Sequence, residues 1–168
     1  MTRWLVAVLA ALGILIAVGH RQASATGDIF TDATAQAGIA WRHSNGESSE
    51  KFLIEAMGGG VAFLDFDADG LLDVFFITGG ETPKSPHSSS PRNALYRNLG
   101  NGKFEDVAEK AGLARIPFYG MGVAAADFDN DGYPDLYITG YPSCAVFHNN
   151  RDGTFTDITD KAGVKNAG

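Results

Sequence analysis

Cysteine is nearly absent from this sequence, which has only Cys144 among its 168 residues. A single cysteine cannot pair within the chain, so the protein has no internal disulfide. Cys144 begins the apolar run Cys-Ala-Val-Phe. We therefore expect it to be buried as a small hydrophobic side chain rather than to remain a free reactive thiol.

Positive charge is also scarce, since 13 Lys and Arg residues stand against 20 Asp and Glu residues, a net charge of −7. Nucleic acid and anionic lipid attract basic surfaces, and an acidic chain repels both. We therefore expect neither as a partner.

Catalytic and phosphate-binding motifs are lacking too. There is no Gly-x-Ser-x-Gly elbow, and the histidines (His20, His43, His87 and His148) show no metal-binding spacing. The glycine runs at 58–60 and 120–122 are not followed by Lys-Ser/Thr, so they are not phosphate loops. We expect these glycines to let the inner strands approach one another closely. Because no catalytic motif is present, we expect the protein to bind a ligand without catalysis.

A long apolar run occurs only at the start, over residues 4–18, after Arg3 and before Ala23-Ser24-Ala25. This order is typical of a secretory signal, so residues 1–25 are predicted to be a signal peptide cleaved after Ala25. The mature chain would then be secreted or periplasmic. The alternative is a membrane anchor formed by residues 4–18, although this run is shorter than the roughly 20 residues that span a bilayer.

Two near-identical nine-residue stretches dominate the rest of the sequence, at 65–73 and 127–135. Each has Asp at positions 1, 3, 5 and 9 and Gly at position 6. Four carboxylates so close together repel one another unless a cation lies between them. Calcium suits such a loop, because it takes six to eight oxygen ligands from carboxylates and backbone carbonyls.

Two calcium sites are therefore predicted, with a carbonyl ligand at position 7 of each loop. The predicted ligands are Asp65, Asp67, Asp69, Leu71 and Asp73 in the first loop, and Asp127, Asp129, Asp131, Tyr133 and Asp135 in the second. An acidic hairpin turn without metal is the simpler alternative. An EF-hand is excluded, because position 12 is Phe76 or Ile138 rather than Glu and the flanks resemble strands.

Longer repeats surround these loops. Residues 58–79 match 120–140 at an offset of 62 at their start and 61 at their end, and 94–113 match 145–164 at an offset of 51. We predict one four-stranded blade at 58–113, with a flexible insert at 80–92, and a second blade at 120–164. Residues 26–57 contain a partial copy from Phe30 to Ile39, which predicts a stray strand from the tail of a repeat.

Tandem four-stranded repeats predict an all-β fold, a partial β-propeller of about two antiparallel blades plus the N-terminal strand. A β-sandwich of about eight strands is the alternative, but it gives no reason for the recurring loop.

The segments Gly-Gly-Gly-Val-Ala-Phe-Leu-Asp-Phe-Asp-Ala-Asp-Gly-Leu-Leu-Asp, Leu-Tyr-Arg-Asn-Leu-Gly-Asn-Gly-Lys-Phe-Glu-Asp-Val and Ala-Gly-Leu resemble the FG-GAP/VCBS repeats of the integrin-α type. Within that group the chain looks most like the ASPIC/UnbV, or cartilage-acidic-protein-like, proteins. The resemblance implies a calcium-binding propeller of seven or eight blades. We expect this chain to be an N-terminal fragment of such a protein, or to complete its fold by self-association.

The leading hypothesis is an exported calcium-binding propeller module for protein or glycan recognition, with structural calcium and no catalysis. The alternative is the scaffold portion of a larger propeller enzyme that acts on polysaccharide or another extracellular substrate.

Overall fold

The computed structural model describes residues 30–80 and 92–165. The predicted signal peptide at 1–25 and most of the predicted insert at 80–92 lie outside the described residues.

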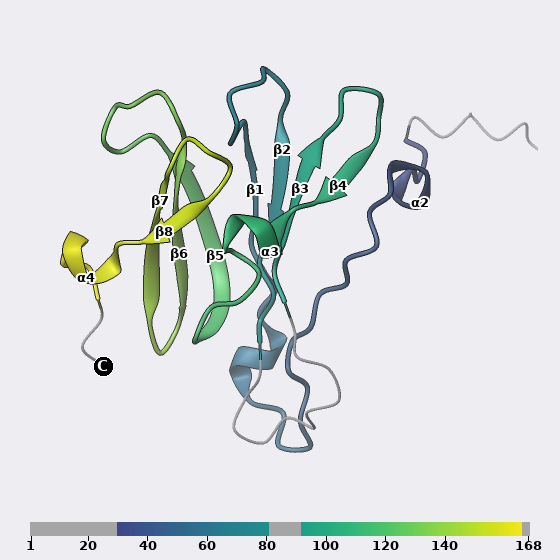
Figure 1. Ribbon diagram of the computed structural model, residues 1–168. Coiled ribbons are helices and arrows are strands. Elements are labelled where there is room, and N and C mark those ends of the chain that lie inside the picture. The colour runs from purple at the N-terminus through teal and green to yellow at the C-terminus, as the bar shows by residue number, and fades with distance from the viewer. Residues whose placement is uncertain (1–29, 81–91, 166–168) are drawn as a thin grey trace, which may run out of the picture. The chain divides into compact units, whose positions relative to one another are not determined.

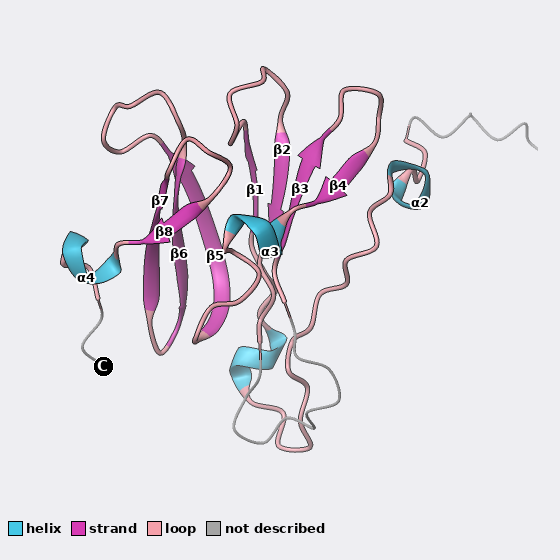
Figure 2. Ribbon diagram, viewed as in Figure 1, coloured by secondary structure: helices cyan, strands magenta, loops and turns pink. Residues whose placement is uncertain are grey.

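The described chain is built around two four-stranded antiparallel sheets, each with its strands in sequence order (Figures 1 and 2). The predicted all-β class is therefore confirmed, and the two sheets have the form of propeller-like blades. The first sheet contains β1 (Val61–Leu64), β2 (Asp73–Phe76), β3 (Ala94–Asn98) and β4 (Phe104–Asp106), and the second contains β5 (Tyr119–Ala126), β6 (Asp135–Tyr141), β7 (Cys144–Asn149) and β8 (Phe155–Asp157).

Strand register places the two acidic loops at equivalent points. Leu64 pairs with Asp73 where β1 meets β2, and Ala126 pairs with Asp135 where β5 meets β6. The last aspartate of each loop is thus already the first residue of the next strand. β1 alternates exposed and buried side chains, as expected for a strand with one face in the core.

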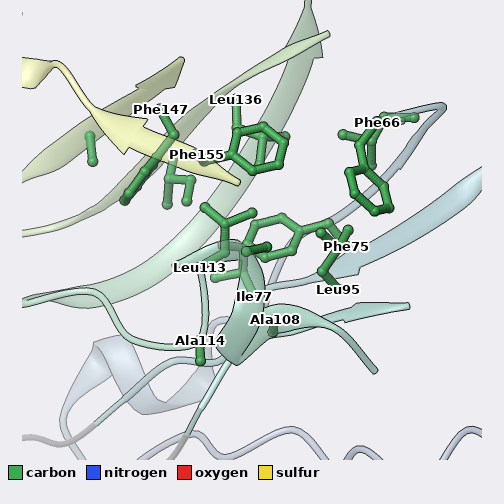
Figure 3. Close-up of a cluster of buried hydrophobic side chains, with 14 residues drawn as sticks. Phe66, Phe75, Ile77, Leu95, Ala108, Leu113, Ala114, Leu136, Phe147 and Phe155 are labelled. Atoms are coloured by element: carbon green, nitrogen blue, oxygen red, sulfur yellow. The ribbon is translucent and has the colours of Figure 1, made fainter. Parts of the chain in front are cut away.

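The main hydrophobic core draws side chains from both sheets (Figure 3). Leu113 and Ala114, which follow β4, join it as well. Burial of large apolar side chains is the main stabilising contribution, at roughly 25 cal/mol per Å² of apolar surface. Its fully buried large side chains include Phe75 and Leu95 of the first sheet, Ile77 directly after β2, and Leu136 and Ile138 of the second sheet.

A smaller cluster covers the opposite face of the first sheet. Trp41 stacks on Phe76 with ring centroids 4.8 Å apart, and its indole N–H donates to the carbonyl of Arg92 at 2.8 Å. Tyr96 accepts from the backbone N–H groups of Ala40 and Trp41. The segment before β1 is therefore fixed to the sheet by packing and hydrogen bonds together.

Two expectations about small residues are confirmed. A Cβ atom at Gly60 would lie 2.8 Å from the Val123 backbone nitrogen, so the inner strands β1 and β5 approach closely only because glycine is there. Cys144 is buried, as expected of a small hydrophobic side chain.

The predicted N-terminal strand is wrong for residues 30–57, which contain the helical turns α2 (Thr34–Ala37) and η1 (Leu53–Ala56) but no strand. The corresponding residues of the full repeats, β4 and β8, pair with the preceding strand of a hairpin. The partial copy lacks that preceding half, so it keeps only the helical turn.

The equivalent turns in the two blades are α3 (Ala108–Ala111) and α4 (Thr159–Ala162). None of the helices in the described part of the chain combines the length and hydropathy needed to cross a bilayer.

One buried amide links the two blades. Asn149 of β7 is fully buried, and its Nδ2 donates to the carbonyl of Phe66 at 2.8 Å and to that of Pro134 at 3.2 Å. Its repeat equivalent, Asn98, donates within its own blade to the carbonyl of Leu72 at 3.0 Å. Asn149 therefore differs from Asn98 in its hydrogen bond to Phe66, which joins the two blades.

Asn149→Ala should lower the free energy of unfolding by about 1–3 kcal/mol more than Asn98→Ala, because it leaves a buried carbonyl of the other blade without its donor. Denaturant titration of both variants tests this. Equal losses would show that the link between the blades contributes nothing.

Candidate metal centres

The two acidic loops have the same backbone path. Gly70 and Gly132 have φ of +84° and +91°, a left-handed conformation that favours glycine. Two residues earlier, Ala68 and Asn130 also have positive φ, at 56° and 59°. The duplicated sequence thus folds twice into one turn.

The first aspartate of each loop closes that turn. The two carboxylate oxygens of Asp65 accept from the N–H groups of Asp69 at 3.0 Å and Gly70 at 2.9 Å. Asp127 accepts in the same way from Asp131 at 3.0 Å and Gly132 at 2.8 Å. These hydrogen bonds set the loop shape from within.

The aspartate at position 9 ties each loop to its sheet. Asp73 is 0% exposed and accepts from the N–H of Phe66 at 3.1 Å and of Asn98 at 2.7 Å. Asp135, 1% exposed, accepts from Phe128 at 3.2 Å and Asn149 at 2.7 Å. Each carboxylate therefore joins the start of its loop to the end of the third strand.

Three carboxylates converge in each loop. One oxygen from each of Asp65, Asp67 and Asp73 lies within 4.8 Å of the others, and Asp127, Asp129 and Asp135 form the matching group. Such groups can hold a metal ion. We call them the first and second cages.

The remaining predicted ligands lie differently. Asp69 is outside the first cage, whereas Asp131 forms a further group with Asp129 and His148. Leu71 and Tyr133 donate their backbone N–H groups to Asp69 and Asp131, at 2.9 and 2.8 Å. A ligand role for their carbonyls stays a prediction.

The first cage fits a cation on two counts. Oδ1 of Asp67 is buried, and none of the described residues donates a hydrogen bond to it. Burial raises the pKa of Asp73, and the charges of Asp67 and Asp69 raise it further against the opposing N–H bonds from Asn98 and Phe66. A bound cation would satisfy the unpaired oxygen and favour the ionised carboxylates.

The sequence did not single out Arg97, which reaches into the first loop from β3. Its Nε lies 2.7 Å from Asp67 Oδ2 and its Nη2 lies 3.5 Å from Asp69 Oδ2. The Nε contact with Asp67 is an ion pair but not a hydrogen bond. Nε has no hydrogen-bond partner among the described residues. Arg97 therefore neutralises charge without using Asp67 Oδ1.

His148 lies at the second loop, although the spacing of the histidines in the sequence does not indicate a metal site. Its Nδ1 is 3.1 Å from Asp135 Oδ1 and 3.5 Å from Asp129 Oδ2. A clue was available, because the offset of 51 places His148 at the position of Arg97.

The arginine of the second loop comes from a different position. Arg151 Nε donates to Asp131 Oδ2 at 2.7 Å. Burial alone would raise the pKa of Asp131, but hydrogen bonds from Tyr133 and Arg151 lower it on balance. Asp131 is therefore held ionised beside the second cage.

Comparison with protein families finds the FG-GAP-like repeat over residues 65–138 and 127–168, which together cover more than half of the chain. Both matches begin at the first aspartate of an acidic loop. The predicted resemblance to these repeats is confirmed.

Two relatives match a 44-residue segment. Cartilage acidic protein 1 of Xenopus tropicalis is 43% identical and that of Mus musculus is 48% identical over this length. The segment is 26% of this chain and 7% of each relative. These partial matches support the cartilage-acidic-protein-like assignment within the family.

Asp73 and Asp67, the buried and the half-buried carboxylate of the first cage, should differ in how much stability is lost when each is truncated to alanine. Asp73→Ala leaves two backbone donors unpaired, so it should lower the free energy of unfolding by about 2–5 kcal/mol whether or not calcium is present. Asp67→Ala should cost less than about 1 kcal/mol in chelator, because its pair with the half-exposed Arg97 is weak. Thermal and denaturant unfolding in chelator compare them, and equal losses would refute the division of roles.

Proposed function

This chain belongs to the FG-GAP-like repeat family, and we propose that it is an exported, non-catalytic β-propeller module whose two acidic loops are braced by structural calcium and whose surface recognises a protein or glycan. The observation that carries the proposal is the duplicated cage. The same carboxylates, in the same hydrogen-bond framework, converge at the same point of both blades.

Calcium is favoured by the chemistry of the donors. The two matching cages offer carboxylate oxygens, which are the ligands of a hard divalent cation. The carboxylates of each cage repel one another, and Asp67 Oδ1 lacks a donor among the described residues. An ion that neutralises each cage would hold the turn between two strands.

The stabilisation expected from such ions is modest but useful. Extracellular calcium modules bind at about 0.1–1 mM. With a dissociation constant of about 0.1 mM and free calcium of about 1 mM, each ion adds roughly 1.4 kcal/mol, and two add about 3 kcal/mol. That is a large share of a typical folding free energy of about 5–15 kcal/mol.

Export agrees with this affinity range, because sites of this strength fill only where calcium is plentiful. The sequence supports export through the signal-like order of residues 1–25. After cleavage the chain would keep no membrane span.

Recognition of a ligand is favoured over catalysis because the sequence contains no catalytic motif such as a Gly-x-Ser-x-Gly elbow. Exposed aromatic side chains such as Phe63 and Tyr141 suit a binding surface, since rings bury much area at interfaces. The acidic charge disfavours nucleic acid. The further blades of a longer chain, or another copy of this one, would cover the open sheet faces.

Removing calcium with a chelator should lower the melting temperature of the protein, and restoring it should recover about 3 kcal/mol of stability. Asp67→Ala and Asp129→Ala should each remove about half of that gain. Differential scanning calorimetry with and without calcium measures it.

Asp160→Ala is the matched control, because Asp160 is an exposed acid paired with Lys165, away from both cages. It should keep the full response to calcium. Equal melting temperatures with chelator and with calcium for the unaltered protein would refute the proposal.

A recognition module should bind without turnover. We expect glycan-array or protein-array binding that requires calcium and releases no product, checked by mass spectrometry of the incubated ligand. Calcium-dependent cleavage of any glycan would instead favour the enzyme scaffold.

A further inference from the structure

The two cages differ at one matched position of the third strand. Arg97 in β3 and His148 in β7 are equivalent at the offset of 51 that relates the two blade tails. Arg97 lies 2.7 Å from Asp67 Oδ2, and His148 lies 3.5 Å from the equivalent Asp129 Oδ2. Both side chains thus point at the aspartate at position 3 of their loop, with different chemistry.

Arginine and histidine do opposite things beside a metal ion. A guanidinium stays protonated and has no lone pair to donate, so Arg97 can only repel a cation and compete for its carboxylates. A neutral imidazole offers a nitrogen that zinc, nickel and copper accept readily, whereas calcium takes oxygen ligands. Arg97 and His148 should therefore give the two cages different ion selectivities.

The donors around His148 suit a transition ion. Ligand atoms of His148, Asp129 and Asp131 all lie within 4.8 Å of one another, and Asp135 Oδ1 is 3.1 Å from the imidazole Nδ1. One nitrogen with two or three carboxylate oxygens is a set that zinc binds. In the neutral tautomer protonated at Nε2, Nδ1 presents its lone pair to this group.

We propose that the second cage is a mixed site, which binds calcium through its carboxylates and also takes a zinc-class ion through His148, whereas Arg97 restricts the first cage to oxygen-ligated calcium. The inference rests on the proposed calcium function and adds an ion selectivity to one of its two sites. Zinc would displace calcium from the second cage and leave calcium in the first.

The structure also predicts how the cages behave without metal. Arg97 spans Asp67 and Asp69 as a built-in cation for the first loop. In the second loop, Arg151 pairs with Asp131 and leaves Asp129 to His148. The second cage therefore has a side chain that can leave its ion pair and become a ligand, and the first has none.

An exchange of the two residues in the full chain tests the proposal. Isothermal titration calorimetry with Zn²⁺ and, separately, with Ca²⁺ gives stoichiometry and affinity for the unaltered protein, for His148→Arg and for Arg97→His. Zn²⁺ is diamagnetic, so the imidazole resonances in an NMR spectrum report directly whether a histidine nitrogen is a ligand.

We expect His148→Arg to weaken zinc binding at the second cage at least about ten-fold and to abolish the zinc-induced shift of one imidazole. Arg97→His should add a second zinc equivalent. His43→Arg is the matched control, since His43 is exposed near Trp41 and belongs to neither cage, and zinc binding at the cage should be unchanged.

The outcomes separate this inference from the function on which it rests. Calcium binding at both cages with no zinc binding, or with zinc binding that His148→Arg does not alter, overturns the inference and leaves the structural calcium intact. Zinc binding that depends on His148 without any calcium uptake supports the zinc ligand role of His148 but overturns both the mixed site and the proposed calcium function.

Discussion

Repulsion among carboxylates confined to a nine-residue turn is the constraint on which both blades depend. Each loop joins the first two strands of a sheet, and its last aspartate is both a loop residue and the first residue of the second strand. The fold offsets part of that repulsion with backbone N–H groups and with Arg97 or Arg151. The rest is what a divalent cation would neutralise, so the proposed ion binding would be linked to sheet formation.

Within each cage the carboxylates differ in burial and in their hydrogen-bond partners. Asp73 and Asp135 are almost completely buried and fully engaged with backbone donors, so they act as parts of the framework. Asp67 and Asp129 are more accessible, and each pairs with a side chain from the third strand. One short motif therefore contains carboxylates with a structural role and carboxylates to which we assign the proposed ligand role, and a side chain of the third strand lies beside the latter.

Much of the fold was readable from the sequence because repetition is a local signal. The two offsets predicted two four-stranded blades, and the structure contains both. The N-terminal partial copy misled the strand prediction, because similarity to β4 and β8 does not supply the hairpin partner that those strands need. The aspartates, glycines and turn shape of the cages were likewise visible as a motif.

The sequence by itself determined the class of fold, the two acidic loops and the oxygen-rich chemistry they offer, since these depend on residues that are neighbours in the chain. Only the tertiary structure decided which side chains from other strands enter each cage. Arg97 and His148 lie more than 10 residues from their loops, and they reach the carboxylates because β3 and β7 pair with the strands that end those loops. Strand pairing, which local pattern does not encode, thus makes two nearly identical motifs chemically different.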